Sequence, residues 1–311
     1  MGISREQTLE CFRSDDLVGL GMEADAVRRR LHPEGVVSYA AMCRVDCAAL
    51  VSGRDAESGA ACSEIAAAID NGAIGVRLVG GFGIVRDGIA WLEGMLREMR
   101  RQFPQIWIEG PMAAELEEMA TRCGFGVRDL IARLRDAGLD AIAGDGPLLK
   151  DADAVADWIE AHRVAHGLGM RTCAGMVFGA GETAEQRVDF LEAVRGLQEE
   201  TGGFVAFVPM AAEAQGGREL DGVTAVERLK TLAIARMFLD NVENVQADGI
   251  AQGLKVLQTA LRFGANDAGA VMVAGDGLCA GASEEDLRRV IRDAGFRPAE
   301  RDAAYRAMVW S

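Results

Sequence analysis

The chain has 311 residues, half of them apolar, and a formal net charge of −15 at pH 7. This length is ordinary for a single α/β barrel. An acidic chain without clustered Lys and Arg argues against nucleic acid as a partner, because phosphate contacts need basic patches. We find neither a signal peptide nor a run of about 18 apolar residues, and therefore expect a cytoplasmic protein with no membrane partner. Seven irregularly spaced cysteines favour reduced thiols over a disulfide framework.

The first 34 residues have a helical pattern that stops at His32-Pro33, because the residue before a proline disfavours the helical conformation. A unit of apolar run, glycine-containing loop and amphipathic helix then repeats. Such alternation gives parallel strands joined by right-handed crossovers, and eight units predict a (β/α)8 TIM-type barrel. We expect an N-terminal helical extension at 1–34 and one barrel domain, including C-terminal helices, at 35–311. The predicted strands are residues 36–42, 74–79, 105–109, 141–143, 171–178, 204–208, 242–247 and 269–273.

Helices are predicted between these strands, and local signals mark several of their ends. Thr183 and Gln186 form a capping-box pattern, Ser283 precedes acidic first-turn residues, and Gly138 is typical of the position after a helix end. The functional groups of such barrels lie at the carboxyl ends of the strands, which here include 109–112 and 144–147. The predicted helices are residues 89–102, 116–119, 127–137, 153–166, 184–200, 225–239 and 284–294.

Two cysteines, Cys43 and Cys47, follow the first predicted strand at Cys-x3-Cys spacing, and we expect them to lie in a loop. A third thiolate three residues later would complete an iron–sulfur pattern, but Leu50 stands there and cannot bind iron. One hypothesis is a cluster completed by Cys62 or by a partner's thiol. The simpler interpretation is that the two cysteines are a remnant of a metal site with no metal bound.

Two other patterns are weaker indications of a binding site. His162 and His166 are spaced to bind zinc from one helix, but Arg163 follows His162 where a HExxH motif has glutamate. We therefore expect a solvated helix face. The segment Gly80-Gly-Phe-Gly83 lacks the GxGxxG spacing of a dinucleotide-binding loop.

Several long segments carry a resemblance to known enzymes. The chain resembles the radical S-adenosylmethionine (SAM) enzymes of the futalosine route to menaquinone, above all dehypoxanthine futalosine cyclase, with aminodeoxyfutalosine synthase and the FO synthase subunits as cousins. The resemblance implies a barrel of the radical SAM type, a [4Fe–4S] cluster on a Cys-x3-Cys-x2-Cys motif, and SAM on the fourth iron. The segments are RRRLHPEG (28–35), RLRDAGLDAIAGDG (133–146), MRTCAGMVFGAGET (170–183), LQEETGGFVAFVP (197–209) and the run from 228 to 272.

The SAM half of the expected site departs from the family pattern. Besides Leu50 at the third cysteine, Ala49 replaces the aromatic residue that usually precedes it, and Leu148 replaces the glutamate that contacts the SAM ribose. Gly80 and Gly81 are kept where the family contacts the SAM amino group. We interpret them as the remnant of a SAM site.

The opposite half keeps the family's polar residues. The resemblance implies substrate contacts from them, and we consider Asp267, Asp248 and Glu182 as catalytic acid or base candidates. As an alternative, Asn266 and Asp267 cap a turn before the last strand, and Glu182 merely precedes the cap at Thr183. The expected substrate contacts are Glu182, Thr183, Gln252, Asn266 and Asp267.

We therefore favour a cluster-deficient homologue with no resident cofactor. It binds a small nucleoside-like or polar ligand, or associates with an authentic futalosine-pathway enzyme. One alternative is an active radical SAM enzyme of menaquinone biosynthesis, with SAM and a [4Fe–4S] cluster completed by an atypical ligand. Another is a repurposed barrel with acid–base chemistry at the old substrate face.

Overall fold

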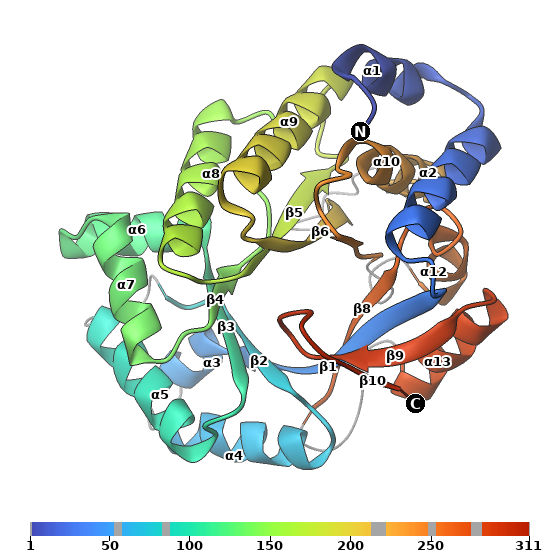
Figure 1. The fold of residues 1–311 in the computed structure, drawn as a ribbon. Helices are drawn as coiled ribbons and strands as arrows, with labels where there is room; N and C mark the ends of the chain where they lie inside the picture. The colour runs from blue at the N-terminus through green and yellow to red at the C-terminus, as the bar shows by residue number, and fades with distance from the viewer. Residues whose placement is uncertain are drawn as a thin grey trace.

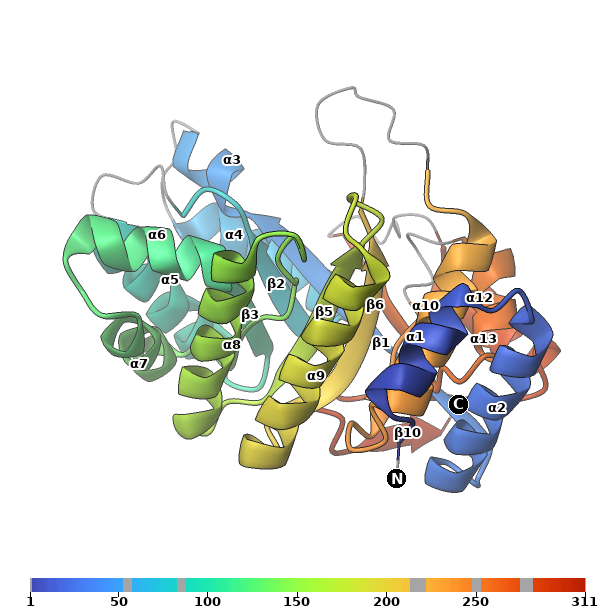
Figure 2. The same ribbon diagram turned by 90° about the horizontal axis from the view of Figure 1, so that it is seen from above.

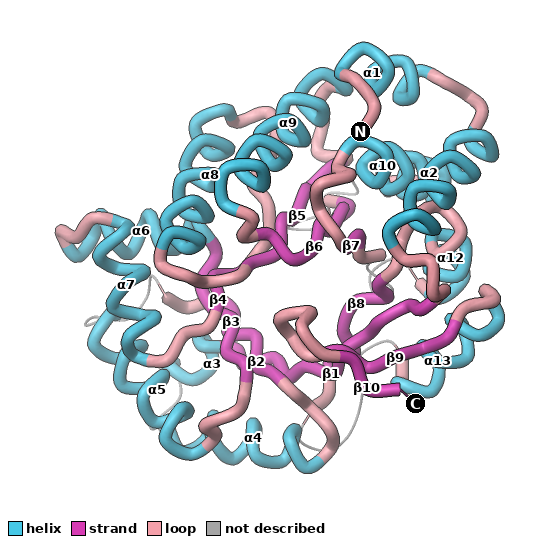
Figure 3. The backbone as a smooth tube through the Cα atoms, viewed as in Figure 1, coloured by secondary structure: helices cyan, strands magenta, loops and turns pink. Residues whose placement is uncertain are grey.

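Eight parallel strands form a ring in the described part of the chain, and helices surround it (Figures 1 and 3). The structure is a computed structural model that describes residues 2–52, 58–82, 88–212, 222–247, 253–274 and 282–310. All eight predicted strands are present. They are β1 (Val36–Asp46), β2 (Gly75–Val79), β3 (Trp107–Met112), β4 (Ala141–Ala143), β5 (Thr172–Phe178), β6 (Phe204–Ala211), β7 (Asn244–Val245) and β8 (Asp267–Met272).

The ring closes through two ladders and two short junctions. Strands β8, β1, β2, β3 and β4 are paired in that order, and β5, β6 and β7 form a second ladder. Between β4 and β5, the Gly175 amide donates to the Gly144 carbonyl at 2.7 Å. Between β7 and β8, the Ala247 amide donates to the Asp267 carbonyl at 2.8 Å. This closed parallel arrangement confirms the predicted (β/α)8 fold class.

The surrounding helices cover the outer face of the strands with a continuous apolar core. The predicted capping box forms at Thr183, and Gly138 ends its helix at φ +123°. Ser283 is the expected N-cap of its helix and also forms a capping box with Asp286. Figure 2 shows helices standing against the strands in side view. They are α3 (Cys47–Ser52), α4 (Ser58–Asp70), α5 (Gly88–Gln102), α6 (Ala113–Cys123), α7 (Val127–Ala137), α8 (Ala152–Gly167), α9 (Ala184–Thr201), α10 (Ala225–Phe238), α12 (Leu254–Ala260) and α13 (Glu284–Asp293).

The N-terminal segment forms α1 (Arg5–Arg13) and α2 (Leu17–Leu31), which pack beside α10 (Figure 2). Leu20 and Ala24 of α2 share a buried cluster with Ile234 and Met237 of α10. The helical character expected for this segment is therefore present. The division into an extension and a barrel domain stays a prediction. Within the described residues, no helix has both the length and the apolar character needed to span a membrane.

The C-terminal segment was only partly predicted. The expected helix α13 is present, but a β-hairpin of β9 (Arg297–Arg301) and β10 (Met308–Trp310) follows it. Strand β9 runs parallel to the amino half of β1, pairing with 36–39. Figure 1 shows the connection between β9 and β10 reaching toward the centre of the ring. Because β9 lies at the amino end of β1, this hairpin closes the barrel interior from the end opposite the mouth at the carboxyl ends of the strands.

Candidate functional site

The barrel encloses a cavity of about 470 Å³ that every one of the eight strands, or the residue just after it, helps to line. This volume lies in the range of small-molecule sites. The wall is divided by chemistry. The charged side is formed by Arg77 on β2, Glu109 on β3 and Asp145 after β4, and the apolar side includes Met42, Val208, Met210, Ala270 and Met272.

Arg77 lies between two carboxylates on this charged wall. Its Nε is 3.5 Å from Glu109 Oε1, and its guanidinium also pairs with Asp145. Burial raises the pKa of Glu109 even though Arg77 opposes the shift. Burial acts against the charge of Arg77, but Glu109 and Asp145 outweigh it and raise its pKa. Chemically, this wall offers carboxylate acceptors to a hydrogen-bond donor, and Glu109 takes up a proton more readily than an exposed carboxylate does.

The cavity floor is built by the C-terminal hairpin. Arg301 on β9 donates to both oxygens of Asp267 at 2.5 and 3.2 Å, and its guanidinium lies 3.8 Å from the centre of the Tyr305 ring. Tyr305 has φ +58° and donates to Gln246 at 3.3 Å. Cys173 also lines the cavity, and burial raises the pKa of its thiol to about 12. At neutral pH this thiol is protonated and is a poor nucleophile.

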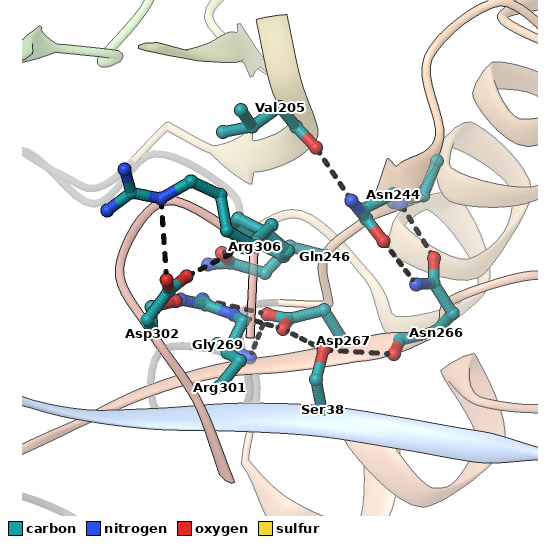
Figure 4. Close-up of polar contacts among 12 residues, drawn as sticks. Ser38, Val205, Asn244, Gln246, Asn266, Asp267, Gly269, Arg301, Asp302 and Arg306 are labelled. Carbon is teal, nitrogen blue, oxygen red and sulfur yellow. Dashed lines mark hydrogen bonds and ion pairs between the residues drawn. The ribbon is translucent and has the colours of Figure 1, made fainter. Parts of the chain in front are cut away.

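Asn266 and Asp267 lie at the amino end of β8 (Figure 4), and not at the carboxyl ends of the strands, where the functional groups of such barrels are expected. The strand begins at Asp267, two residues earlier than predicted. Asp267 accepts hydrogen bonds from Ser38, Arg301 and the Gly269 amide. The position therefore supports the alternative of a turn leading into the last strand, and the ligand contact stays a prediction.

Asn266 is fully engaged in backbone and side-chain contacts. Its Oδ1 accepts from Arg236 at 2.5 Å and from the Val245 amide at 2.9 Å. Its Nδ2 donates to Asn244 at 2.8 Å (Figure 4). Arg236 itself is buried, which lowers its pKa to about 9. These contacts tie α10 to β7 and β8.

Glu182 braces the turn after β5. Its carboxylate accepts from the amides of Gly179 and Ala180 at 2.7 and 2.8 Å and pairs with Arg187 at 2.7 Å. These contacts lower its pKa against the effect of burial. Glu182 does not line the barrel cavity, and Thr183 caps α9 beside it. The substrate contacts of Glu182 and Thr183 stay predictions, and so does the catalytic role considered for Glu182. Asp248 and Gln252 lie outside the described residues, so the catalytic role of Asp248 and the substrate contact of Gln252 stay predictions as well.

The two cysteines are not in a loop, contrary to expectation. Strand β1 continues through Cys43 to Asp46 because 42–46 pair in register with 75–79 of β2, and Cys47 begins α3. Side chains alternate along β1. Met42 and Arg44 face the interior, where they line cavities, and Cys43 is buried on the side of the surrounding helices.

A [4Fe–4S] cluster requires three thiolates that converge on one space, and the described residues do not fit this requirement. Burial raises the pKa of Cys43 to about 11 and that of Cys47 to about 12, so both are protonated at neutral pH. Leu50 packs against the apolar core. Within the described ranges, no group of three or more His, Cys, Asp or Glu side chains is placed to hold a metal ion.

Of the two glycines expected to mark the SAM site, Gly80 lines a second cavity of about 270 Å³ at the mouth, together with Arg44 and Glu115. Both glycines have positive φ, +66° at Gly80 and +76° at Gly81. A Cβ at Gly81 would lie 2.4 Å from the Ala48 nitrogen, so its missing side chain allows the turn to pack on α3. The SAM contact of this turn stays a prediction.

His162 and His166 do not form the solvated face that we expected. His162 is fully buried, and its ring lies 4.1 Å from that of Trp158. Both histidines share the Thr172 hydroxyl at 2.8 Å. The prediction was wrong because α8 turns this face toward β5, which the spacing alone does not reveal.

Comparison with known proteins identifies the family of this barrel. A sequence profile described as the CofH/MqnC C-terminal region matches residues 201–311. A cyclic dehypoxanthine futalosine synthase of Streptomyces coelicolor is 31% identical across 99% of this chain and 86% of its own length. The chain belongs to the cyclic dehypoxanthine futalosine synthase family. This confirms the resemblance seen in the sequence segments.

Two other relatives of this futalosine synthase homologue are named for different reactions. An aminodeoxyfutalosine synthase of Thermus thermophilus is 30% identical across 99% of this chain and 93% of its own length. A 5-amino-6-(D-ribitylamino)uracil–L-tyrosine 4-hydroxyphenyl transferase of Methanothermobacter thermautotrophicus is 31% identical across 94% of this chain and 90% of its own length.

Solved structures support the fold of this family member. Methylornithine synthase (PylB) superposes with a TM-score of 0.67 at 13% identity, covering 96% of this chain and 95% of that chain. The hydrogenase maturase HydG of Carboxydothermus hydrogenoformans gives 0.62 at 16% identity, covering 98% and 78%. Identities this low carry the fold and no activity.

In this futalosine synthase homologue, sequence reasoning missed the charged wall. The ranges 109–112 and 144–147 were expected at strand ends, but Glu109 and Asp145 were not predicted as site residues. Arg77 was not predicted as a site residue either. One signal was available. Arg77 and Glu109 are charges inside short apolar runs, and a charge facing a barrel interior needs a partner or a ligand.

Proposed function

We propose that this member of the futalosine synthase family is a cluster-deficient homologue, which binds a small nucleoside-like or polar ligand in the barrel cavity without radical chemistry. The burial of Cys43 and Cys47, with Leu50 at the third position, is the observation that carries the proposal. A protonated, buried thiol has to be exposed and deprotonated before it binds iron. Two such thiols on different elements cannot replace the three of the family motif.

The cavity supports a binding role. It is lined from all eight strands, closed at the amino end by Arg301 and Tyr305, and adjoins the mouth cavity through Arg77, Asp145 and Met272. Ligand pockets combine a mostly apolar wall with a few placed polar groups. An apolar methionine side and a charged side meet this description.

Anaerobic reconstitution with iron and sulfide tests the proposal. We expect no charge-transfer absorbance of an iron–sulfur centre, substoichiometric iron, and no conversion of SAM to 5′-deoxyadenosine. A four-iron cluster that cleaves SAM would contradict the proposal and favour the alternative, an active radical SAM enzyme with an atypical ligand. The chain incubated without sulfide controls for iron bound at random.

A further inference from the structure

The residues that line the two adjoining cavities include three arginines and three carboxylates, which are Arg44, Arg77, Arg301, Glu109, Asp145 and Glu115. Arg301 is already neutralised by Asp267, which is buried behind the cavity lining, and Arg44 at the mouth is matched by Glu115 in number. Arg77 alone faces both Glu109 and Asp145. The interior therefore carries one negative charge in excess, and it lies on the charged wall.

Glu109 is the carboxylate with capacity left for a ligand. Asp267 is saturated by Ser38, Arg301 and the Gly269 amide. Asp145 is in close contact with the Arg77 guanidinium. Glu109 has Arg77 at 3.5 Å as its ionic partner and accepts no hydrogen bond from the described residues, although 22% of its side chain is accessible from the cavity.

The apolar side of the cavity favours an apolar body. Met42, Met210 and Met272 face the cavity from β1, β6 and β8. Thioether side chains are adaptable and make favourable contacts with aromatic rings. A ligand that satisfies both walls has a flat apolar part and a hydrogen-bond-donating or positively charged nitrogen at one end.

We propose that the barrel cavity binds a small organic cation, in which an amine or amidinium nitrogen pairs with Glu109 and an apolar or aromatic body packs on the three methionines. This inference rests on the proposed ligand-binding function and adds the chemical class of the ligand. A charge-assisted hydrogen bond inside the barrel, where charges are less screened than in bulk water, is the contact that selects the cation over a neutral isostere.

Benzamidine and benzamide are suitable probes, because they share a ring and differ in the charge of the head group. Dissociation constants are measured by calorimetry on the full chain and on the Glu109→Gln variant. We expect benzamidine to bind at least about tenfold more tightly than benzamide, a difference that one charged contact supplies, and the variant to lose this preference. Glu118→Gln is the matched control, because Glu118 pairs with Arg122 on the exposed surface of α6.

Equal binding of the two probes, no binding of either, or an unchanged preference in Glu109→Gln would overturn the inference. If that variant does not fold, Ala270→Leu takes its place, because Ala270 lines the cavity and a larger side chain fills it without changing charge. Ala270→Leu is expected to abolish benzamidine binding, and retained binding would overturn the inference. Failure of the proposed function is read separately, since SAM cleavage after reconstitution does not depend on the benzamidine preference.

Discussion

Single buried polar side chains join the last strands of the barrel. Asn266 and Arg236 are both buried, and between them they satisfy the carbonyls of Glu243 and Gly264 and the amide of Val245. Buried polar groups are costly unless paired, so each partner depends on the other. Asn266, which the resemblance assigned to a substrate contact, thus joins the strands in this part of the fold.

Asn266→Ala is expected to lower the free energy of unfolding by about 2–4 kcal/mol, because it leaves Nη2 of Arg236 and the Val245 amide without their buried acceptor. Urea denaturation measures this change. Gln102→Ala at the exposed end of α5 is the control and should stay within about 0.5 kcal/mol. A stable Asn266→Ala protein that had lost only ligand binding would favour the ligand-contact interpretation.

The burial of His162 and His166 predicts a loss of stability in mild acid. Burial places the pKa of His162 well below that of a free imidazole and lowers that of His166 to about 4. As the pH falls, the unfolded chain takes up these protons first. The two neutral histidines therefore make their full contribution to the free energy of unfolding above about pH 6.5. This contribution is lost as the pH falls toward 4, at up to about 1.4 kcal/mol per pH unit for each histidine.

His166→Gln should flatten this dependence when urea midpoints are compared at pH 7, 5.5 and 4.5. The variant keeps a polar group beside Thr172 and Thr201 but cannot titrate. If the wild type and the variant lost stability in parallel, carboxylates elsewhere would account for the acid sensitivity instead.

At the scale of elements, α3 and the turn after β2 occupy the place where the sequence suggested a cofactor loop. Asp46 caps α3 by accepting from the amides of Ala48 and Ala49 at 2.9 and 3.2 Å. The turn at Gly80 and Gly81 packs against the first residues of this helix. The two segments that the family resemblance assigned to cluster and SAM therefore support each other here through backbone contacts.

Gly81→Ala should destabilise the protein by about 2–4 kcal/mol, because the new Cβ would meet the Ala48 backbone at a positive φ. Thermal denaturation shows whether the melting temperature falls. Gly94→Ala is a matched control in α5, where a Cβ meets nothing within 4 Å, and it should stabilise by about 0.5–1 kcal/mol. If Gly81→Ala left the stability unchanged, the first residues of α3 would not lie against Gly81.

At the scale of the whole molecule, the barrel is closed at one end by its own C-terminus. Arg301 and Tyr305 form the floor of the cavity, and β9 extends the sheet beside β1. The cysteines, in contrast, lie outside the cavity, one of them toward the helices. Stability and ligand binding are therefore expected to be independent of any metal.

Replacing both cysteines, as Cys43→Ala with Cys47→Ala, tests this independence. Lost packing should cost about 1–3 kcal/mol in total, and benzamidine affinity should be unchanged. Iron content after reconstitution should be equally low in wild type and variant. A large loss of iron in the variant alone would show that the two thiols bind metal.

Local patterns in the sequence predicted the fold well, because they depend on neighbouring residues. Strand–helix alternation located all eight strands, and Thr183 and Ser283 marked helix starts where they occur. The hairpin after α13 was missed because 297–301 has no clear alternation and contains Pro298. Its pairing with β1 depends on a strand more than 250 residues earlier.

The sequence by itself determined the barrel class, the family, and the leucine that stands where the motif has its third cysteine. The tertiary structure alone decided that Cys43 faces away from the cavity, that Asp267 lies at the amino end of its strand, and that Arg77, Glu109 and Asp145 meet. The reason is register. A shift of one residue exchanges the two faces of a strand, and register is set only when strands distant in the chain pair and the ring closes.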